Sequence, residues 1–153
     1  MKREKNVKGK IILNLKGVKK KEIKLLTSGI RVVVEKNKDY AVCPNCGALS
    51  NKVYEYRKQF ILDKPNQDNK VEIELNKRRF SCVNNECPLK TFTENIEGLS
   101  STRRYIKAFE NFLKDLVSRQ GYLKAQKSLQ DKYSLNLSLT TLFYLNCSDS
   151  KGN

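Results

Sequence analysis

Four cysteines arranged as two close pairs are the residues of this sequence best suited to chemistry. Cys43 and Cys46 lie three positions apart in the stretch Cys-Pro-Asn-Cys-Gly, and Cys82 and Cys87 form a second pair that starts 36 positions after Cys46. Close cysteine pairs serve as redox disulfides, as structural bridges or as half-sites for a metal ion. The chain contains no histidine, so thiolates would have to supply the soft ligands of any metal site.

The surroundings of the first pair favour metal binding over redox chemistry. A redox pair begins a helix that follows a strand, whereas strand-like residues 53–56 follow this pair without any helical period. Zinc binds four thiolates in a tetrahedron at about 2.3 Å. Pro44 presets one torsion of the tight turn that this requires, and Gly47 permits a left-handed conformation at its end. We predict one structural zinc ion, with unligated thiols or local disulfides as the alternative; its ligands are Cys43, Cys46, Cys82 and Cys87.

The composition indicates an anionic partner. The 153 residues include 31 Lys and Arg against 16 Asp and Glu, which gives a net charge of +15. Residues 1–40 hold 13 basic and 4 acidic side chains, residues 41–98 hold 9 and 8, and residues 99–153 hold 9 and 4. The cysteine-bearing middle is therefore nearly neutral between two basic flanks. Nucleic acid is the commonest partner of such a chain, although solubility alone also accounts for surface lysines.

The apolar runs near the start of the chain are too short to cross a membrane or to form a signal peptide. The run at 32–34 is only three residues long, and a spanning helix needs about 20 apolar residues. We therefore expect a cytoplasmic protein without a membrane partner, in a reducing compartment where thiols serve metals more often than disulfides.

The segment between the cysteine pairs is predicted to form a small antiparallel sheet. Val71, Ile73 and Leu75 alternate with polar residues, which is typical of a half-buried strand. The turn-forming residues 63–69 are expected to link it to a strand over residues 54–62. Such a sheet has a thin core, so metal binding must contribute much of its folding free energy. We assign residues 1–98 to a basic lead-in and a zinc ribbon.

The hydrophobic period changes from two to 3.6 after Ser100, which predicts three helices over residues 99–146, followed by a polar tail over residues 147–153. The first ends before Gly121 and has Ser101 or Thr102 as its cap; its apolar face comprises Ile106, Phe109, Leu113, Leu116 and Val117. The second runs from residue 122 to about 131, and its inward positions are Leu123, Ala125 and Leu129. The third starts with Ser138 as its cap and runs through Leu145. The predicted fold class is α+β.

A helix, a short connection and a capped helix on a basic background resemble a helix-turn-helix, although plain helix packing gives the same pattern. In the third helix we expect the apolar residues to face the core: Leu139, Leu142, Phe143 and Leu145. The outward residues would then be available for the major groove, although none is Arg or Lys: Thr140, Thr141 and Tyr144. Phosphate contacts, with a solvated face as the alternative, are assigned to Arg103, Arg104, Lys107, Lys124 and Lys127.

A longer series of motifs joins the two cysteine pairs. It comprises Cys43-Pro-Asn-Cys46-Gly47, Tyr56-Arg57, Asp63, Arg78-Arg79-Phe80-Ser-Cys82, Asn85-Glu-Cys87 and Thr91-Phe92-Thr93-Glu94. This order resembles the N-terminal zinc ribbon of ISL-type bacterial insertion-sequence transposases. The stretches 13–18 and 30–35 resemble the lead-in of those proteins, and residues 103–145 fall where their helix-turn-helix lies.

The resemblance implies that the chain binds double-stranded DNA at transposon terminal repeats. In that family an RNase H-like domain with an Asp-Asp-Glu metal site follows these modules, whereas this chain stops at Asn153. We therefore expect no enzymatic activity, and a role as a remnant, a subunit or a competitor of a full-length transposase or of a separate catalytic chain. The alternative is an interaction module that docks on a protein or RNA surface through Tyr54, Tyr56, Phe60 and Phe80. A thiol–disulfide enzyme built on Cys43 and Cys46 is disfavoured.

Overall fold

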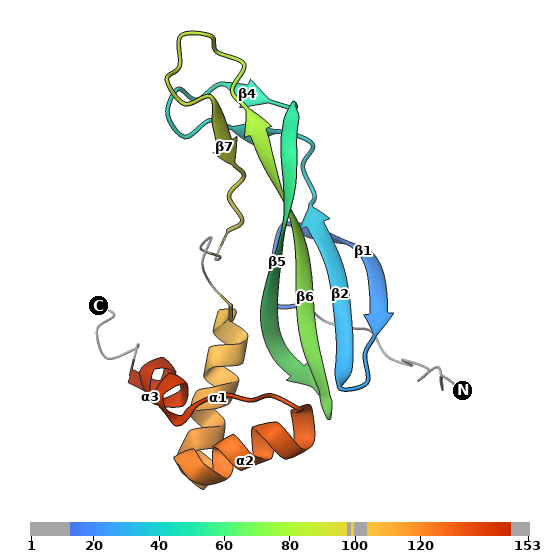
Figure 1. Cartoon of the computed structure of the whole chain (residues 1–153), viewed down its shortest axis with the longest axis vertical. Helices are drawn as coiled ribbons and strands as arrows, with labels where there is room; N and C mark the ends of the chain where they lie inside the picture. Colours follow the sequence, from blue (N-terminus) through green and yellow to red (C-terminus); the bar gives the residue numbers. More distant parts are fainter. Residues whose placement is uncertain (1–12, 98, 100–103, 148–153) are drawn as a thin grey trace.

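The computed structural model describes residues 13–97, 99 and 104–147. The chain forms a sheet at one side, a two-stranded knuckle at one end and three helices at the other end (Figure 1). No described helix has the length and apolar character that crossing a membrane requires. The elements are β1 (Val18–Leu25), β2 (Gly29–Lys36), β3 (Ala41–Val42), β4 (Leu49–Ser50), β5 (Val53–Asn66), β6 (Asn69–Ser81), β7 (Thr91–Thr93), α1 (Lys107–Gln120), α2 (Tyr122–Tyr133) and α3 (Leu139–Cys147).

A long hairpin of β5 and β6 extends from the knuckle to the helices (Figure 1). The predicted alternation is confirmed, since Val71, Ile73 and Leu75 are buried. The predicted turn lies within residues 63–69 but is shorter than predicted: it is confined to residues 67–68, because strand pairing continues to Asn66 opposite Asn69. Asp63 stays in the strand and is buried, and its carboxylate accepts hydrogen bonds from the backbone and side-chain amides of Asn14 at 2.9 and 2.8 Å.

The sheet is mixed rather than purely antiparallel. Its order is β1-β2-β6-β5, with β7 paired to β6. The predicted antiparallel pairing is confirmed for β5 and β6, but β2 and β6 are parallel. The chain runs along β2 to the knuckle, returns along β5 and reverses again into β6, so β2 and β6 point the same way (Figure 1). Gly29 is the first residue of β2 that pairs with β6. A Cβ at this position would lie 2.2 Å from the carbonyl oxygen of Lys70, so the close approach of the two strands requires glycine.

Strand β1 was not indicated by the hydrophobic pattern. Its sequence, VKKKEIKL, has no apolar alternation, and most of its side chains are exposed. It pairs antiparallel with β2 at the edge of the sheet, where lysines discourage pairing with another chain.

Two separate clusters of buried side chains stabilise the molecule. The larger lies between the sheet and the helices and includes Val32, Ile73, Phe109, Leu113 and Leu129. The smaller lies at the knuckle end and consists of Ala41, Cys43, Phe80, Cys87 and Phe92. The thin core that we predicted is therefore confined to the knuckle end.

Helix α1 ends at Gly121 as predicted, with a φ of 80° at that glycine. Its start differs from the prediction, because the helix begins at Lys107 with Ile106 as the N-cap. The expected caps at 101 and 102 lie outside the described residues. In α3 the predicted cap is confirmed, since the backbone amide of Thr141 donates to Ser138 Oγ at 3.0 Å.

Three apolar side chains of α2 and α3 are exposed, contrary to prediction. Leu123 is 71% exposed, because α2 packs through Ala125, Leu129 and Tyr133, and a residue two positions before Ala125 points away from that stripe. In α3 only Leu142 is fully buried, and Leu145 is half-buried. The short helix packs along one narrow stripe, which leaves Leu139 and Phe143 exposed.

Candidate metal centre and nucleic-acid interface

The four predicted metal ligands come together at the knuckle end of the hairpin. Cys43 and Cys46 lie between β3 and β4, Cys82 directly follows β6, and Cys87 lies in the loop before β7. Their Sγ atoms all lie within 4.8 Å of one another. Cys43 and Cys87 are buried, whereas Cys46 is exposed, so one side of the cluster faces solvent.

The distances between the sulfurs fit a tetrahedral zinc centre. Sγ of Cys43 lies 3.9 Å from Sγ of Cys87, and Sγ of Cys46 lies 3.5 Å from Sγ of Cys82. A disulfide needs a separation of about 2.05 Å, so these pairs are not bridged. Four sulfurs at about 2.3 Å from a central ion lie about 3.8 Å apart. The geometry therefore supports zinc, with Cys43, Cys46, Cys82 and Cys87 as its ligands.

The backbone of the first knuckle turns as the sequence predicts. Gly47 adopts a φ of 77°, and its amide donates to the carbonyl oxygen of Cys43 at 2.9 Å. The amide of Cys43 donates in turn to the carbonyl oxygen of Ala48 at 2.9 Å. A side chain that sequence reasoning missed also contributes, because the Asn45 amide donates to Sγ of Cys87 at 3.3 Å. Such a donor orients the sulfur and stabilises its negative charge.

The electrostatics of the cluster also favour a cation. A hydrogen bond from the backbone of Ala48 lowers the pKa of the Cys46 thiol. The backbone of Asn84 acts to lower the pKa of Cys82, but burial and the neighbouring thiols outweigh it and raise that pKa to about 12. Four thiolates this close repel one another unless a cation lies between them. Metal binding therefore displaces protons from these sulfurs.

A buried ion pair supports the knuckle from below. The Arg78 guanidinium, on β6, lies 2.9 Å from the Glu94 carboxylate, and it also donates to the carbonyl oxygen of Lys38. The side chain of Glu94 is fully buried. This pair joins β6, the segment after β7 and the loop before β3. The motif quoted above contains both residues, but their pairing was not predicted.

Comparison with known proteins identifies one similarity. Residues 39–87 match the family model described as the zinc-finger of transposase IS204/IS1001/IS1096/IS1165. The matched segment contains all four clustered cysteines. No curated protein and no solved structure matches the chain.

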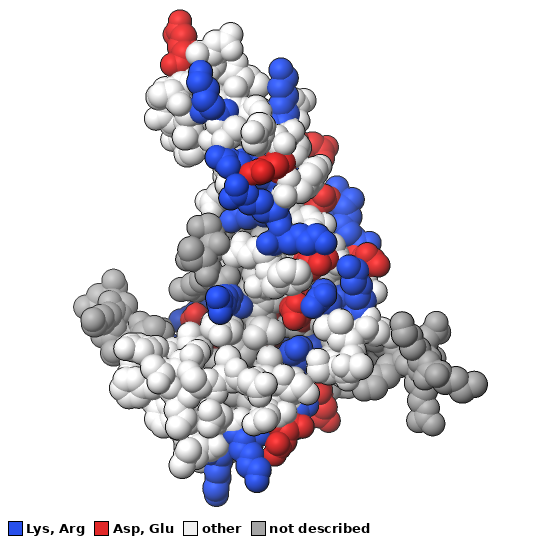
Figure 2. Space-filling view, in the orientation of Figure 1, with Lys and Arg blue, Asp and Glu red and all other residues white. Residues whose placement is uncertain are grey.

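The residues predicted to contact phosphates lie before α1, at its first residue and on α2. Arg104 precedes α1, Lys107 begins α1, and Lys124 and Lys127 lie on α2; all four are exposed. Arg103 lies outside the described residues. On the face shown in Figure 2, Lys and Arg gather over the hairpin, whereas the surface over α3 is largely uncharged.

Helix α3 carries the residues predicted to read base edges. Thr140 is exposed and Tyr144 is 70% exposed, so both side chains are available to a partner. The hydroxyl of Thr141 lies 2.8 Å from Ser138 Oγ, so it belongs to the cap of the helix. Helix α3 contains no charged residue. Its outward surface therefore offers hydroxyl groups and aromatic rings rather than cations.

Proposed function

We propose that this chain is a zinc-dependent DNA-binding protein that recognises the ends of a transposon. The observation that carries the proposal is the match of residues 39–87 to a transposase zinc-finger, in a segment whose four cysteine sulfurs lie within 4.8 Å of one another. One zinc ion holds the knuckle end together, and the net charge of +15 supplies attraction to a polyanion.

The three helices are the part of the protein that reads DNA, in a helix-turn-helix arrangement. Lys124 and Lys127 contact phosphates from α2, Lys107 does so from the first residue of α1, and Arg104 does so from the segment before α1. Arg103, which lies outside the described residues, is assigned the same role. Thr140 and Tyr144 read base edges from α3, together with Thr141, whose hydroxyl also bonds to Ser138 Oγ at the cap; the surface of α3 bears no competing negative charge. The partner is the terminal repeat of a transposon, and the chain acts beside a full-length transposase or a separate catalytic chain.

We also propose that the chain does not itself cleave DNA. Two acidic side chains of the sheet are paired with basic partners: Glu72 with Arg31 at 2.9 Å, and Glu74 with Lys24 at 3.6 Å. Incubation of the zinc-loaded protein with supercoiled DNA and Mg²⁺ or Mn²⁺ tests this. Nicking by the purified chain contradicts the proposal.

Charge reversal on α2 tests where duplex DNA binds. The double variant Lys124→Glu/Lys127→Glu should weaken binding to all duplexes and reduce the salt slope by about two, because each lost phosphate contact releases about one counterion fewer. The matched control is Lys52→Glu/Lys90→Glu, which makes the same charge change at exposed positions near the knuckle. An equal loss in both variants contradicts the assignment to the helices. Binding that does not depend on salt favours docking on a protein instead.

Substitutions on α3 test base reading. A random duplex library is first selected with the wild-type protein to define a preferred sequence. Thr140→Ala and Tyr144→Ala should then reduce the preference for that sequence over random duplex by about 1–3 kcal/mol each. The charge reversals on α2 should leave this preference intact. If the preference survives both α3 substitutions, α3 is not the reading helix.

A further inference from the structure

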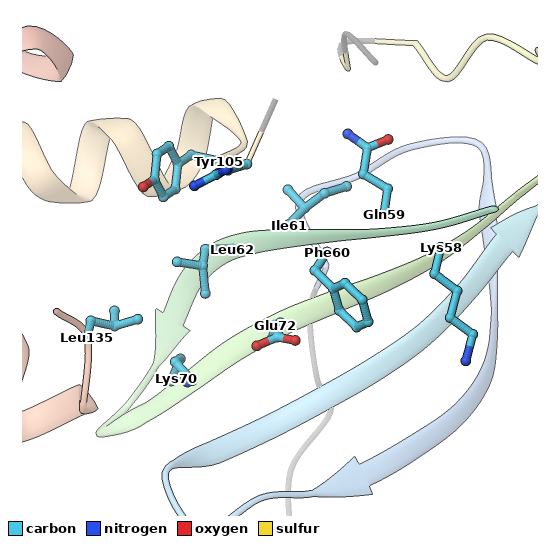
Figure 3. Close-up of a pocket in the computed structure, with 10 residues that line it drawn as sticks. Lys58, Gln59, Phe60, Ile61, Leu62, Lys70, Glu72, Tyr105 and Leu135 are labelled. Carbon is cyan, nitrogen blue, oxygen red and sulfur yellow. The ribbon is translucent and has the colours of Figure 1, made fainter. Parts of the chain in front are cut away.

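A groove at the open side of strand β5 is not used by the proposed duplex-reading surface on α2 and α3. Its volume is about 510 Å³. Figure 3 shows Phe60 and Lys58 on one side of β5 and Tyr105 on the other. The residues that line the groove include Lys58, Phe60, Lys70, Glu72, Arg104 and Tyr105.

Two exposed aromatic rings follow each other along one face of β5. Phe60 is 46% exposed and Tyr56 is 62% exposed. The pairing of β5 with β6 has no irregularity between residues 55 and 63, so residues 56, 58 and 60 share one face of the sheet. Four residues of strand separate the two rings by about 13 Å, which is close to the length of about four stacked nucleotides.

The ring of Phe60 already has a cation on one side. The Arg31 guanidinium carbon lies 5.1 Å from the ring centroid, and the same guanidinium pairs with Glu72 at 2.9 Å. Glu72 is therefore neutralised. Glu74, which lies on the same face, is buried between Lys24 and Lys58 at 3.6 and 3.7 Å.

The remaining charge of the groove is positive. Lys58 is 62% exposed at its side chain, and Lys70 and Arg104 also line the groove. Aromatic rings that stack on bases, combined with cations that follow the backbone, are the elements of a surface for single strands. A duplex hides its base faces, so it offers nothing to stack on these rings.

We propose that this groove binds single-stranded DNA. One base stacks on the exposed face of Phe60 and another on Tyr56, which continues the same face of β5 beyond the groove, while Lys58 and Lys70 contact phosphates. The choice of DNA rather than RNA rests on the proposed function, but the stacking does not. The protein would thus hold an unpaired strand on the sheet and a duplex on the helices.

The absence of tryptophan from the sequence permits a site-specific test. Phe60→Trp introduces a single reporter whose fluorescence a stacked base quenches. The matched control is Tyr40→Trp: Tyr40 is 43% exposed and has a lysine ammonium 5.9 Å from its ring centroid, but it lies outside the groove. A dT12 oligonucleotide should quench Phe60→Trp and leave Tyr40→Trp unchanged. Equal quenching at both positions, or none at position 60, overturns the proposal.

Affinity measurements separate this site from the duplex site. Phe60→Leu and Tyr56→Leu should each weaken binding of dT12 about tenfold and leave duplex binding unchanged, because Leu keeps strand packing but removes stacking. Tyr40→Leu should change neither. Zinc content and circular dichroism establish that each variant is folded. Loss of duplex binding in the same variants, or tighter binding of U12 than of dT12, overturns the proposal. Binding of dT12 by a protein that binds no duplex would refute the proposed function and leave this inference standing.

Discussion

The two ends of the β5–β6 hairpin are stabilised in different ways. At the helix end, side chains from the sheet and three helices form one large apolar core. At the knuckle end, the buried cluster is small, and two of its five members, Cys43 and Cys87, are also predicted metal ligands. The same pair of strands thus runs from a region that apolar packing stabilises to a region that has too few apolar side chains for such packing. We infer from the comparison that metal binding at the proposed zinc site compensates for the missing core.

Removing a metal ligand should have the largest effect and should separate the two ends. Structural zinc contributes on the order of 10 kcal/mol of folding free energy in small modules. We expect Cys82→Ser, or a strong chelator, to abolish zinc binding and to remove hydrogen-exchange protection from residues 41–52 and 82–93, while the helices keep theirs. Cys147→Ser, at an exposed position on α3, should retain zinc. Uniform loss of protection in both regions would show that the two ends unfold as one.

Truncating a core side chain should affect the helix end instead. Phe109 is fully buried and lies between the rings of Tyr105 and Phe112. Phe109→Ala should lower the free energy of unfolding of this region by about 4 kcal/mol, without changing the zinc content. Phe143→Ala removes the same side chain from a 53% exposed position and should have little effect. Denaturant unfolding followed by helical circular dichroism measures both. Loss of zinc in Phe109→Ala would contradict the separation of the two ends.

The buried pair of Arg78 and Glu94 lies between the two regions. Glu94→Gln leaves the Arg78 guanidinium buried without a counter-charge, so we expect a loss of about 3 kcal/mol in the free energy of unfolding. The control is Glu55→Gln, which removes a more exposed partner of Arg57 and Arg79 and should matter less. Urea unfolding of both variants gives the comparison. Equal losses would mean that burial of the pair adds nothing.

The smallest expected effect concerns the cap of α3. Ser138→Ala removes the acceptor of the Thr141 amide and should cost about 1 kcal/mol, confined to α3. Ser118→Ala changes an exposed serine within α1, where alanine favours the helix, and should not destabilise the protein. Hydrogen exchange in α3 reports the difference. A loss of protection that reaches the knuckle would contradict the local assignment.

The sequence predicted the grouping of the four cysteines, because the spacing within each close pair is a local signal. Cysteine spacing, Pro44 and Gly47 specify a turn that places two sulfurs on one ion, and a second pair completes the set. The alternation around Ile73 and the helical period around Leu113 are equally local signals. These parts of the fold follow from short stretches of chain.

Other features depend on contacts between distant residues, so the sequence did not predict them. Asp63 has the character of a turn residue but is buried, because Asn14 supplies its hydrogen bonds. The parallel pairing of β2 and β6 follows from the route of the whole chain. Leu123 has an apolar side chain but lies opposite the packed stripe of α2. In each case the partner, rather than the residue itself, decides the position.

The continuity of the β5–β6 hairpin has a mechanical consequence. The 13 residues of β6 span about 40 Å without interruption. The length of the hairpin therefore sets the distance between the knuckle end and the helices. Removing two facing residues from each strand shortens the hairpin by about 7 Å and keeps every remaining side chain on its original face of the sheet. Removing one residue from each strand instead moves the side chains beyond the deletion to the opposite face of the sheet. The number of residues in the two strands therefore determines the distance between the knuckle end and the helices, independently of the side chains at either end.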